Sequence, residues 1–287
     1  MRLSVGFGLA AYAVLSALSP RAAAPPAIGL SHVPVAVADL SRAASDFERL
    51  GFALKVGRAH DDGIVNRHAK FTDGTEVELI TAPAATDALT GYYRRFLADG
   101  DGAAFLSLYA ESTDDAERRL AAARLPVRRG EGVLDFPYEH ALGYVFFAGL
   151  NQSPTDRPEH FAHANSAFRL EGVWLEGQSL AAEAHLFTAL GLKAGPCVDD
   201  PAPTSSCVPL ARHQWIHLAT TPTEVGRRIA GLTVSVRSLA VVEDRLGRER
   251  IEFRKGRGGG WSSLVVNGST AHGVRLEFRE YSQAGRR

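Results

Sequence analysis

The chain has 287 residues, and its 32 lysines and arginines balance its 32 aspartates and glutamates. A hydrophobic content of 45% and a charged content of 22% are typical of a soluble globular protein with enough chain for two ordinary domains. Because no excess of basic residues would attract phosphates, we expect no nucleic-acid partner.

The first 24 residues have the pattern of a secretory signal peptide. Arg2 provides a positive start, Val5 to Leu18 form a short apolar core, and Ala22 to Ala24 offer small residues for cleavage. This core is shorter than the roughly 20 residues that a membrane-spanning helix needs. We therefore expect cleavage, a periplasmic or secreted mature protein and no stable membrane span after cleavage, with a retained membrane anchor as the alternative.

The pattern of residues 29–83 predicts a strand, a helix and three further strands. Val33, Val35 and Val37 give the first strand its period of two. Helical spacing follows as far as Gly51, a residue suited to end a helix in a left-handed conformation. The expected strands are 30–37, 52–56, 65–72 and 75–81, with a helix cap at Asp39 or Ser41 and a tight turn at Asp73-Gly74.

Three motifs in this segment resemble the glyoxalase and vicinal-oxygen-chelate (VOC) superfamily, particularly its bacterial glyoxalase-like domain proteins. The motifs are Ser31-His32-Val33-Pro34-Val35-Ala36-Val37-Ala38-Asp39-Leu40, Leu50-Gly51-Phe52 and Asp73-Gly74-Thr75-Glu76-Val77-Glu78-Leu79. In that superfamily a histidine early in the first strand and a glutamate on the last strand bind a metal. The resemblance therefore implies that His32 and Glu78 are ligands of a divalent ion, which would be zinc, nickel, iron or manganese.

Three later segments repeat the βαβββ order less clearly, over residues 103–150, 168–219 and 229–278. Phe105 and Gly231 occupy the place of His32, Glu277 occupies that of Glu78, and Ala148 lies near a position where the superfamily often has a polar residue. We therefore predict an α+β fold of four modules, paired into two curved mixed sheets. The expected divisions are a glyoxalase-like domain at 28–150, a linker at 151–167 and a second, degenerate module pair at 168–281.

A metal site needs at least a third ligand, and the sequence offers several. His68 shares a strand face with Asn66 and Lys70 by alternation, and His140, His160 and His163 are further choices. We expect Asn66 and His140 to line the ligand cavity.

Each proposed ligand also has a structural reading. His32 would then be an ordinary strand histidine, and Glu78, which shares a face with Glu76, would point outward to solvent. Facing inward, Glu78 would need a cation or a donor, because burying an unpaired carboxylate is very costly. In the second half His217 and Glu277 lack partners on their opening strands, so we expect a structural or ligand-binding role there.

Only two cysteines occur, Cys197 and Cys207, in one loop that is rich in proline and turn-forming residues. In an exported protein this arrangement predicts a local disulfide. A redox pair or a metal clip is the alternative, but the spacing matches no common zinc pattern.

These observations favour a metal-dependent lyase, isomerase or dioxygenase-type enzyme acting on a small oxygenated molecule, with the metal as Lewis acid. The alternative is a metal-free protein that binds and sequesters a small hydrophobic or aromatic compound, as resistance proteins of the superfamily do. A third reading keeps the fold only as a scaffold. Residues 256–260 are glycine-rich but lack the Lys-Ser/Thr of a phosphate-binding loop. The expected partner is a small-molecule ligand, and a homodimer is compatible with the sequence.

Overall fold

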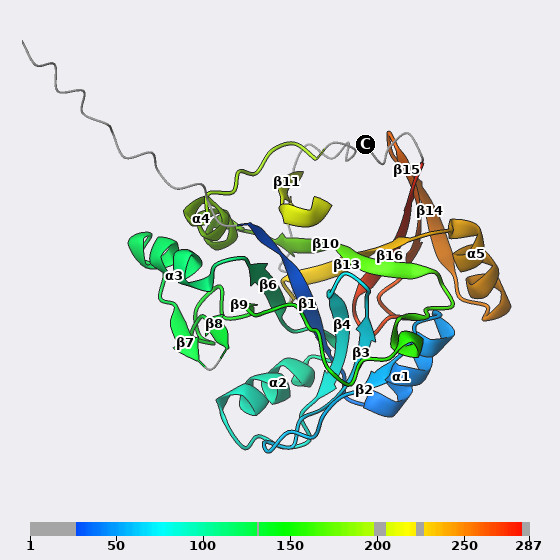
Figure 1. Cartoon of the computed structure of the whole chain (residues 1–287), viewed down its shortest axis with the longest axis horizontal. Helices are drawn as coiled ribbons and strands as arrows, with labels where there is room; N and C mark the ends of the chain where they lie inside the picture. Colours follow the sequence, from blue (N-terminus) through cyan, green and yellow to red (C-terminus); the bar gives the residue numbers. More distant parts are fainter. Residues whose placement is uncertain (1–26, 131, 198–204, 222–226, 283–287) are drawn as a thin grey trace, which may run out of the picture.

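A computed structural model describes residues 27–130, 132–197, 205–221 and 227–282. The expected signal peptide lies outside these ranges. Within them, no helix is both long and apolar enough to cross a membrane. The predicted α+β fold with two mixed sheets is confirmed (Figure 1).

The first sheet contains the first two modules and has the strand order β2-β3-β4-β1-β6-β9-β8-β7, with β5 paired to β1. Module one comprises β1 (Ile28–Ala36), α1 (Leu40–Arg49), β2 (Lys55–Val56), β3 (Val65–Lys70) and β4 (Glu76–Thr81). Helix α2 (Ala88–Ala98) leads to β5 (Gly102–Ala103), and module two comprises β6 (Leu106–Ala110), α3 (Thr113–Ala122), β7 (Arg128–Gly130), β8 (Val133–Asp135) and β9 (Val145–Phe147). The antiparallel pair of β1 and β6 joins the two modules at the centre of the sheet.

The second sheet has the order β11-β12-β10-β13-β16-β15-β14. Its elements are β10 (Ala167–Gly177), α4 (Ala181–Ala189), β11 (Ser205–Pro209), β12 (Trp215–Thr220), β13 (Ile229–Val236), α5 (Leu239–Arg248), β14 (Phe253–Arg257), β15 (Trp261–Val266) and β16 (Arg275–Tyr281). Short 3₁₀ turns lie at η1 (Pro158–Phe161) and η2 (Ala211–His213). In the described residues, module three has two strands after its helix, β11 and β12.

Local signals in the sequence explain the ends of the helices. The Asp39 side chain accepts a hydrogen bond from the backbone N–H of Arg42 and caps α1, as the sequence predicts. Gly51 ends that helix with a φ of 94°, a left-handed conformation that glycine adopts without strain. A Cβ at this position would also lie 2.8 Å from Asn165, so the glycine lets the linker pack against the helix end.

The two sheets share one hydrophobic core. The rings of Phe52 and Phe278, one from each module pair, stack with their centroids 5.9 Å apart. Gln214 also joins the sheets, because its Oε1 accepts from the backbone N–H of Leu30 and its Nε2 donates to the carbonyl of Leu170. In Figure 1, β10 and β13 of the second sheet run across the ends of β1 and β4 of the first. The division into two domains at the expected boundaries stays a prediction.

The predicted disulfide is present between Cys197 and Cys207, whose Cα atoms are 4.8 Å apart. The backbone of Cys207 also pairs with that of Gly195 across an isolated bridge. The disulfide therefore holds the segment after α4 against the edge strand β11.

Candidate functional site

Strand register identifies the four equivalent positions of the first sheet. In module one, Pro34 pairs with Glu78, and His32 lies two residues before Pro34. In module two, Ser107 pairs with Phe146, and Phe105 lies two residues before Ser107. Phe105 therefore takes the place of His32, as expected, while Phe146 takes the place of Glu78. Ala148, which the sequence places near this position, lies two residues after Phe146.

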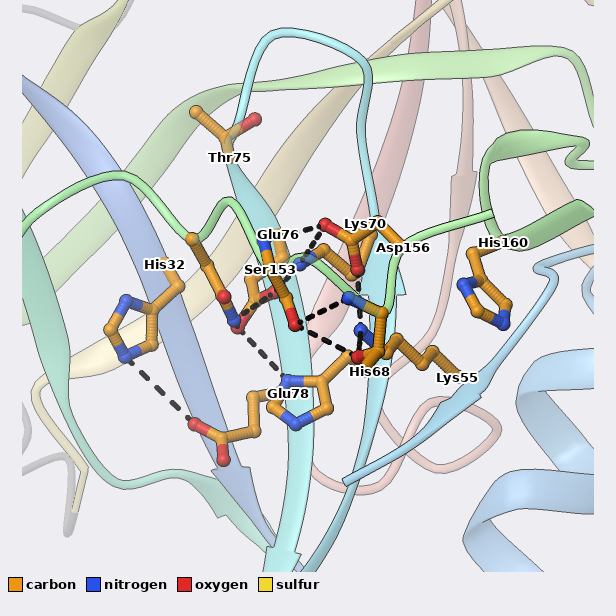
Figure 2. Close-up of polar contacts among 12 residues, drawn as sticks. His32, Lys55, His68, Lys70, Thr75, Glu76, Glu78, Ser153, Asp156 and His160 are labelled. Atoms are coloured by element: carbon orange, nitrogen blue, oxygen red, sulfur yellow. Dashed lines mark hydrogen bonds and ion pairs between the residues drawn. The ribbon is translucent and has the colours of Figure 1, made fainter. Parts of the chain in front are cut away.

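The imidazole of His32 is oriented by its neighbour. The Ser31 hydroxyl donates its single hydrogen to the carbonyl of Gly149 at 2.8 Å, so its oxygen can only accept from His32 Nδ1, 3.0 Å away. On a neutral ring the other nitrogen, Nε2, then carries a free lone pair. That nitrogen lies 3.9 Å from Oε2 of Glu78 (Figure 2). The Phe146 ring makes a T-shaped contact with the imidazole, with centroids 5.3 Å apart.

Glu78 is only 8% exposed, so it does not point outward to solvent. Asn66 donates to its Oε1 at 2.5 Å, and His32 Nε2 lies 3.9 Å from its Oε2. Within the described ranges, no lysine or arginine lies within ion-pairing distance of this carboxylate. A buried carboxylate with one neutral donor is electrostatically incomplete.

His60 was missed by the sequence reasoning, and it extends this polar group. Its Nε2 lies 3.5 Å from Nδ2 of Asn66, so His32, Glu78, Asn66 and His60 form a continuous series. A loop histidine carries no periodic signal, and only the turn-forming residues around it marked the segment as a loop. Asn66 Oδ1 is buried with no hydrogen-bond partner in the described structure.

His68, the first choice for a third ligand, is instead bonded to Glu76. Its Nδ1 lies 3.0 Å from Glu76 Oε1 (Figure 2). Burial lowers the pKa of His68, but the hydrogen bond and charge of Glu76 outweigh burial and raise this pKa above its ordinary value. Burial likewise raises the pKa of Glu76, yet His68 and the two hydrogen bonds from Asn151 bring it below its ordinary value.

An ionic cluster continues from Glu76 into the linker. Buried Lys70 lies 4.0 Å from Glu76 and 2.8 Å from Asp156, which also binds Lys55 at 2.5 Å. Figure 2 shows these residues grouped beside the His32–Glu78 pair. Because its charges are compensated, this cluster fixes the linker to β3 and β4, and Glu76 is far better paired than Glu78.

The remaining histidines considered as third ligands have local roles. His140 Nδ1 accepts from the backbone of Leu142, and His160 Nδ1 accepts from that of Arg157. His163 uses both ring nitrogens, with the carbonyl of Lys70 and the backbone N–H of Ala53. In Figure 2, His160 lies apart from the dashed contacts. In the part of the chain that the structure describes, no three His, Cys, Asp or Glu side chains gather into a metal-binding group.

Aromatic side chains surround the module-two half of this site. Phe105 contacts Phe146 at 6.0 Å, Tyr92 at 4.6 Å and Tyr93 at 5.3 Å between ring centroids. Burial raises the pKa of Tyr93 well above its ordinary value, and the charge of Glu78 raises it further. The site is therefore polar on the side of module one and aromatic on the side of module two.

The second sheet has the same four positions with different residues. Trp174 pairs with His217 and Thr233 pairs with Glu277, so Gly172 and Gly231 lie where His32 would be. A Cβ on Gly172 would come within 2.3 Å of the Trp215 indole, which fills this space.

Glu277 is already compensated, because Arg279 binds it at 2.8 Å and Thr233 donates to it at 2.7 Å. The structural or ligand-binding role expected for the second pair stays a prediction.

A cavity of about 910 Å³ lies over this second sheet, away from the His32–Glu78 pair. The cavity is on the second sheet, whereas the motifs that resemble the superfamily are on the first. Neither Asn66 nor His140, the residues expected to line a ligand cavity, borders this one.

The family model described as "Glyoxalase-like domain" matches residues 30–191. None of the curated proteins matches the sequence significantly.

Among solved structures, a triple mutant of 4-hydroxymandelate synthase from Streptomyces coelicolor is similar with a TM-score of 0.66 and 13% identity, over 92% of this chain and 94% of that one. A catechol 2,3-dioxygenase matches with a TM-score of 0.63 and 13% identity, over 88% and 87% of the two chains. A hypothetical protein from Staphylococcus aureus matches with a TM-score of 0.59 and 11% identity, over 88% and 99%. At these identities the structural matches establish the fold alone.

Proposed function

The chain belongs to the glyoxalase-like domain family, and from this premise we propose that it is a metal-dependent enzyme acting on a small oxygenated molecule at His32 and Glu78. The observation that carries the proposal is the state of Glu78. This carboxylate is buried, faces an oriented imidazole nitrogen and has no basic side chain beside it among the described residues. A cation between the two groups would compensate the charge.

The donor atoms present fit half of a metal centre. Imidazole nitrogen and carboxylate oxygen suit zinc, nickel, iron or manganese. The 3.9 Å between His32 Nε2 and Glu78 Oε2 is slightly longer than the roughly 3.3–3.6 Å expected between two ligands of a tetrahedral ion at about 2.0–2.2 Å, so a small side-chain movement would let both hold one ion. Further donors would come from the nearest polar side chains, Asn66 and His60, or from His68 if it left Glu76.

The neighbouring side chains have definable tasks in this proposal. Ser31 holds the His32 ring so that Nε2 faces Glu78, and Asn66 holds the carboxylate. Phe105, Phe146 and Tyr92 exclude water and offer flat apolar surface to a substrate. A bound divalent ion would supply Lewis-acid polarisation of a substrate oxygen.

The names of the structural neighbours give weak support for the reaction class. Two of them are named for oxidation or synthesis of hydroxylated aromatic compounds, a catechol 2,3-dioxygenase and a 4-hydroxymandelate synthase. We place this chain in the wider group of lyase, isomerase or dioxygenase-type reactions. We also propose a periplasmic or secreted location, which the signal-like residues 1–24 and the disulfide support.

A second candidate is metal-free binding of a small molecule on the same sheet. It is favoured by Phe105 and Phe146, which fill the two positions where further ligands would be expected. Such a site would hold its ligand by stacking and by hydrogen bonds to His32 and Glu78.

Metal content decides between these candidates. We would measure metal in residues 25–287 by mass spectrometry, beside a His32→Ala/Glu78→Ala variant and a matched His185→Ala/Glu111→Ala variant on exposed positions. About one ion per chain, lost only in the first variant, is expected for a metalloenzyme. No ion in any protein, even after incubation with zinc, nickel, manganese and ferrous iron, would reject the metalloenzyme and leave the binding protein.

A further inference from the structure

The cavity over the second sheet gathers all three tryptophans of the chain. Trp174, Trp215 and Trp261 border it from β10, β12 and β15, and Tyr281 borders it from β16. Its volume of about 910 Å³ is within the range of sites for small organic molecules. These four side chains therefore place a large aromatic surface at the border of the cavity.

The indoles are fixed in place by buried polar groups. Trp174 Nε1 donates to Thr233 at 2.9 Å, and Trp215 Nε1 donates to the fully buried Glu171 at 3.2 Å. Glycines make room for two of the rings, since a Cβ at Gly172 or Gly258 would lie 2.3 Å from the indole of Trp215 or Trp261. The aromatic walls are therefore formed before any ligand arrives.

Arg279 places a guanidinium group against the aromatic walls of this site. Its guanidinium lies over the rings of Trp215 and Trp261, 5.0 Å and 4.0 Å from their centroids. Arg279 is only 8% exposed and binds Glu277 through Nη2. Its Nε, by contrast, is buried with no hydrogen-bond partner among the described residues. Leaving a charged donor unsatisfied is costly, so this nitrogen calls for an acceptor.

The charged residues around the cavity favour a ligand with a negative charge. Four of its lining residues are basic, Lys193, Arg212, Arg257 and Arg279, and Glu277 is the only acidic one in the described ranges. An aromatic cage commonly binds an organic cation, but here the guanidinium of Arg279 already occupies the face of two indoles. A cationic ligand would be repelled, and an anion would be attracted.

From this geometry we propose that the second sheet carries a binding site for a small planar aromatic carboxylate. The ring of the ligand lies against the indoles of Trp174, Trp215 and Trp261. The carboxylate pairs with the guanidinium of Arg279, whose buried Nε would turn toward it on binding, and faces the exposed Arg257 at the rim. This site is independent of the His32–Glu78 pair, which is on the other sheet.

Tryptophan fluorescence offers a direct test, because every tryptophan of the chain borders the cavity. We would titrate the full mature chain with benzoate, and with benzamide, acetate and benzylamine as matched probes. Saturable change with benzoate, at least tenfold weaker binding of benzamide and acetate, and no binding of benzylamine are expected. Equal binding of benzoate and benzamide, or no saturation with benzoate up to about 10 mM, would overturn the proposal.

Variants separate loss of the site from loss of the fold. Arg279→Gln should weaken benzoate binding at least tenfold. Arg257→Gln changes only an exposed residue at the rim and should weaken it about threefold. Arg254→Gln, on the same strand but outside the cavity lining, should leave it unchanged. If Arg279→Gln does not fold, the benzoate affinities of Arg257→Gln and Arg254→Gln are compared instead. Equal affinities of these two variants would refute the proposed site.

Discussion

Replacing Glu78 with glutamine tests whether the charge of this buried carboxylate is uncompensated in the metal-free protein. Glutamine keeps the shape of the side chain and can still accept from Asn66, which lies 2.5 Å from Oε1. In the wild type, two acceptors face each other at 3.9 Å, His32 Nε2 and Glu78 Oε2. The amide group of glutamine can instead donate a hydrogen bond to His32 Nε2. The neutral side chain therefore satisfies both neighbours without a buried charge. We expect Glu78→Gln to stabilise the metal-free protein.

The magnitude follows from the burial of this group. Glu78 is 8% exposed and has one neutral donor, so its ionised form lacks the compensation that buried carboxylates normally have. An unsatisfied buried polar group costs about 1–3 kcal/mol, and we take about 2 kcal/mol for this change. For a protein of this size that gain corresponds to an increase in Tm of about 4–8 °C.

The assay is thermal unfolding at pH 8 in the presence of a chelator, where an ordinary histidine is neutral. Glu76→Gln is the matched control on the same strand and face. Glu76 binds His68, Asn151 and Lys70, so its replacement should destabilise the protein by about 3 kcal/mol. Added metal should then raise the Tm of the wild type and leave that of Glu78→Gln unchanged.

One outcome would refute this reasoning. A decrease in Tm for Glu78→Gln as large as that for Glu76→Gln would mean that the Glu78 carboxylate is already well paired, with His32 protonated beside it. Glu78 would then need no cation, and the metal proposal would lose its main support.

Three further predictions concern stability. Reduction of the Cys197–Cys207 disulfide, which joins residues 10 apart, should cost about 2–3 kcal/mol and lower the Tm in a scan with reductant, while a Cys197→Ser/Cys207→Ser variant should not respond to reductant. Asp156→Asn should cost about 3 kcal/mol at pH 7. Although burial opposes it, pairing with Lys55 and Lys70 holds the pKa of Asp156 well below its ordinary value of 3.8. The stability that Asp156 contributes is therefore present above that value and lost as the pH falls below it, so urea unfolding of wild type and variant should converge in acid and not in alkali. Gln214→Leu removes both side-chain hydrogen bonds of Gln214, of which the one to Leu30 links the two sheets, and should cost about 2–4 kcal/mol in urea unfolding; a cost below about 0.5 kcal/mol would show that Leu30 and Leu170 find other partners.

The sequence determined the elements, because their signals are local. Alternation along 30–37, helical spacing up to Gly51 and the short polar cap at Asp39 each act within a few residues, and the structure has a strand, a helix and a cap there. The motifs around His32 and Glu78 identified the superfamily for the same reason, since each motif lies within one or two neighbouring elements. The disulfide could also be predicted from the sequence, because Cys197 and Cys207 are only ten residues apart.

Only the tertiary structure decided what these elements enclose. Alternation places Glu76 and Glu78 on one face of β4, but only the packing of the sheet determines that this face is buried. The same packing brings His68 beside Glu76 and His32 beside Glu78. Strand register, which pairs residues far apart in the chain, brings Phe146 into the place of a ligand. Trp174, Trp215, Trp261 and Arg279 lie in four strands, and no local pattern joins them. Their meeting depends on the order β12-β10-β13-β16-β15, because hydrogen bonding between strands is non-local and a shift of one residue would turn each side chain to the opposite face.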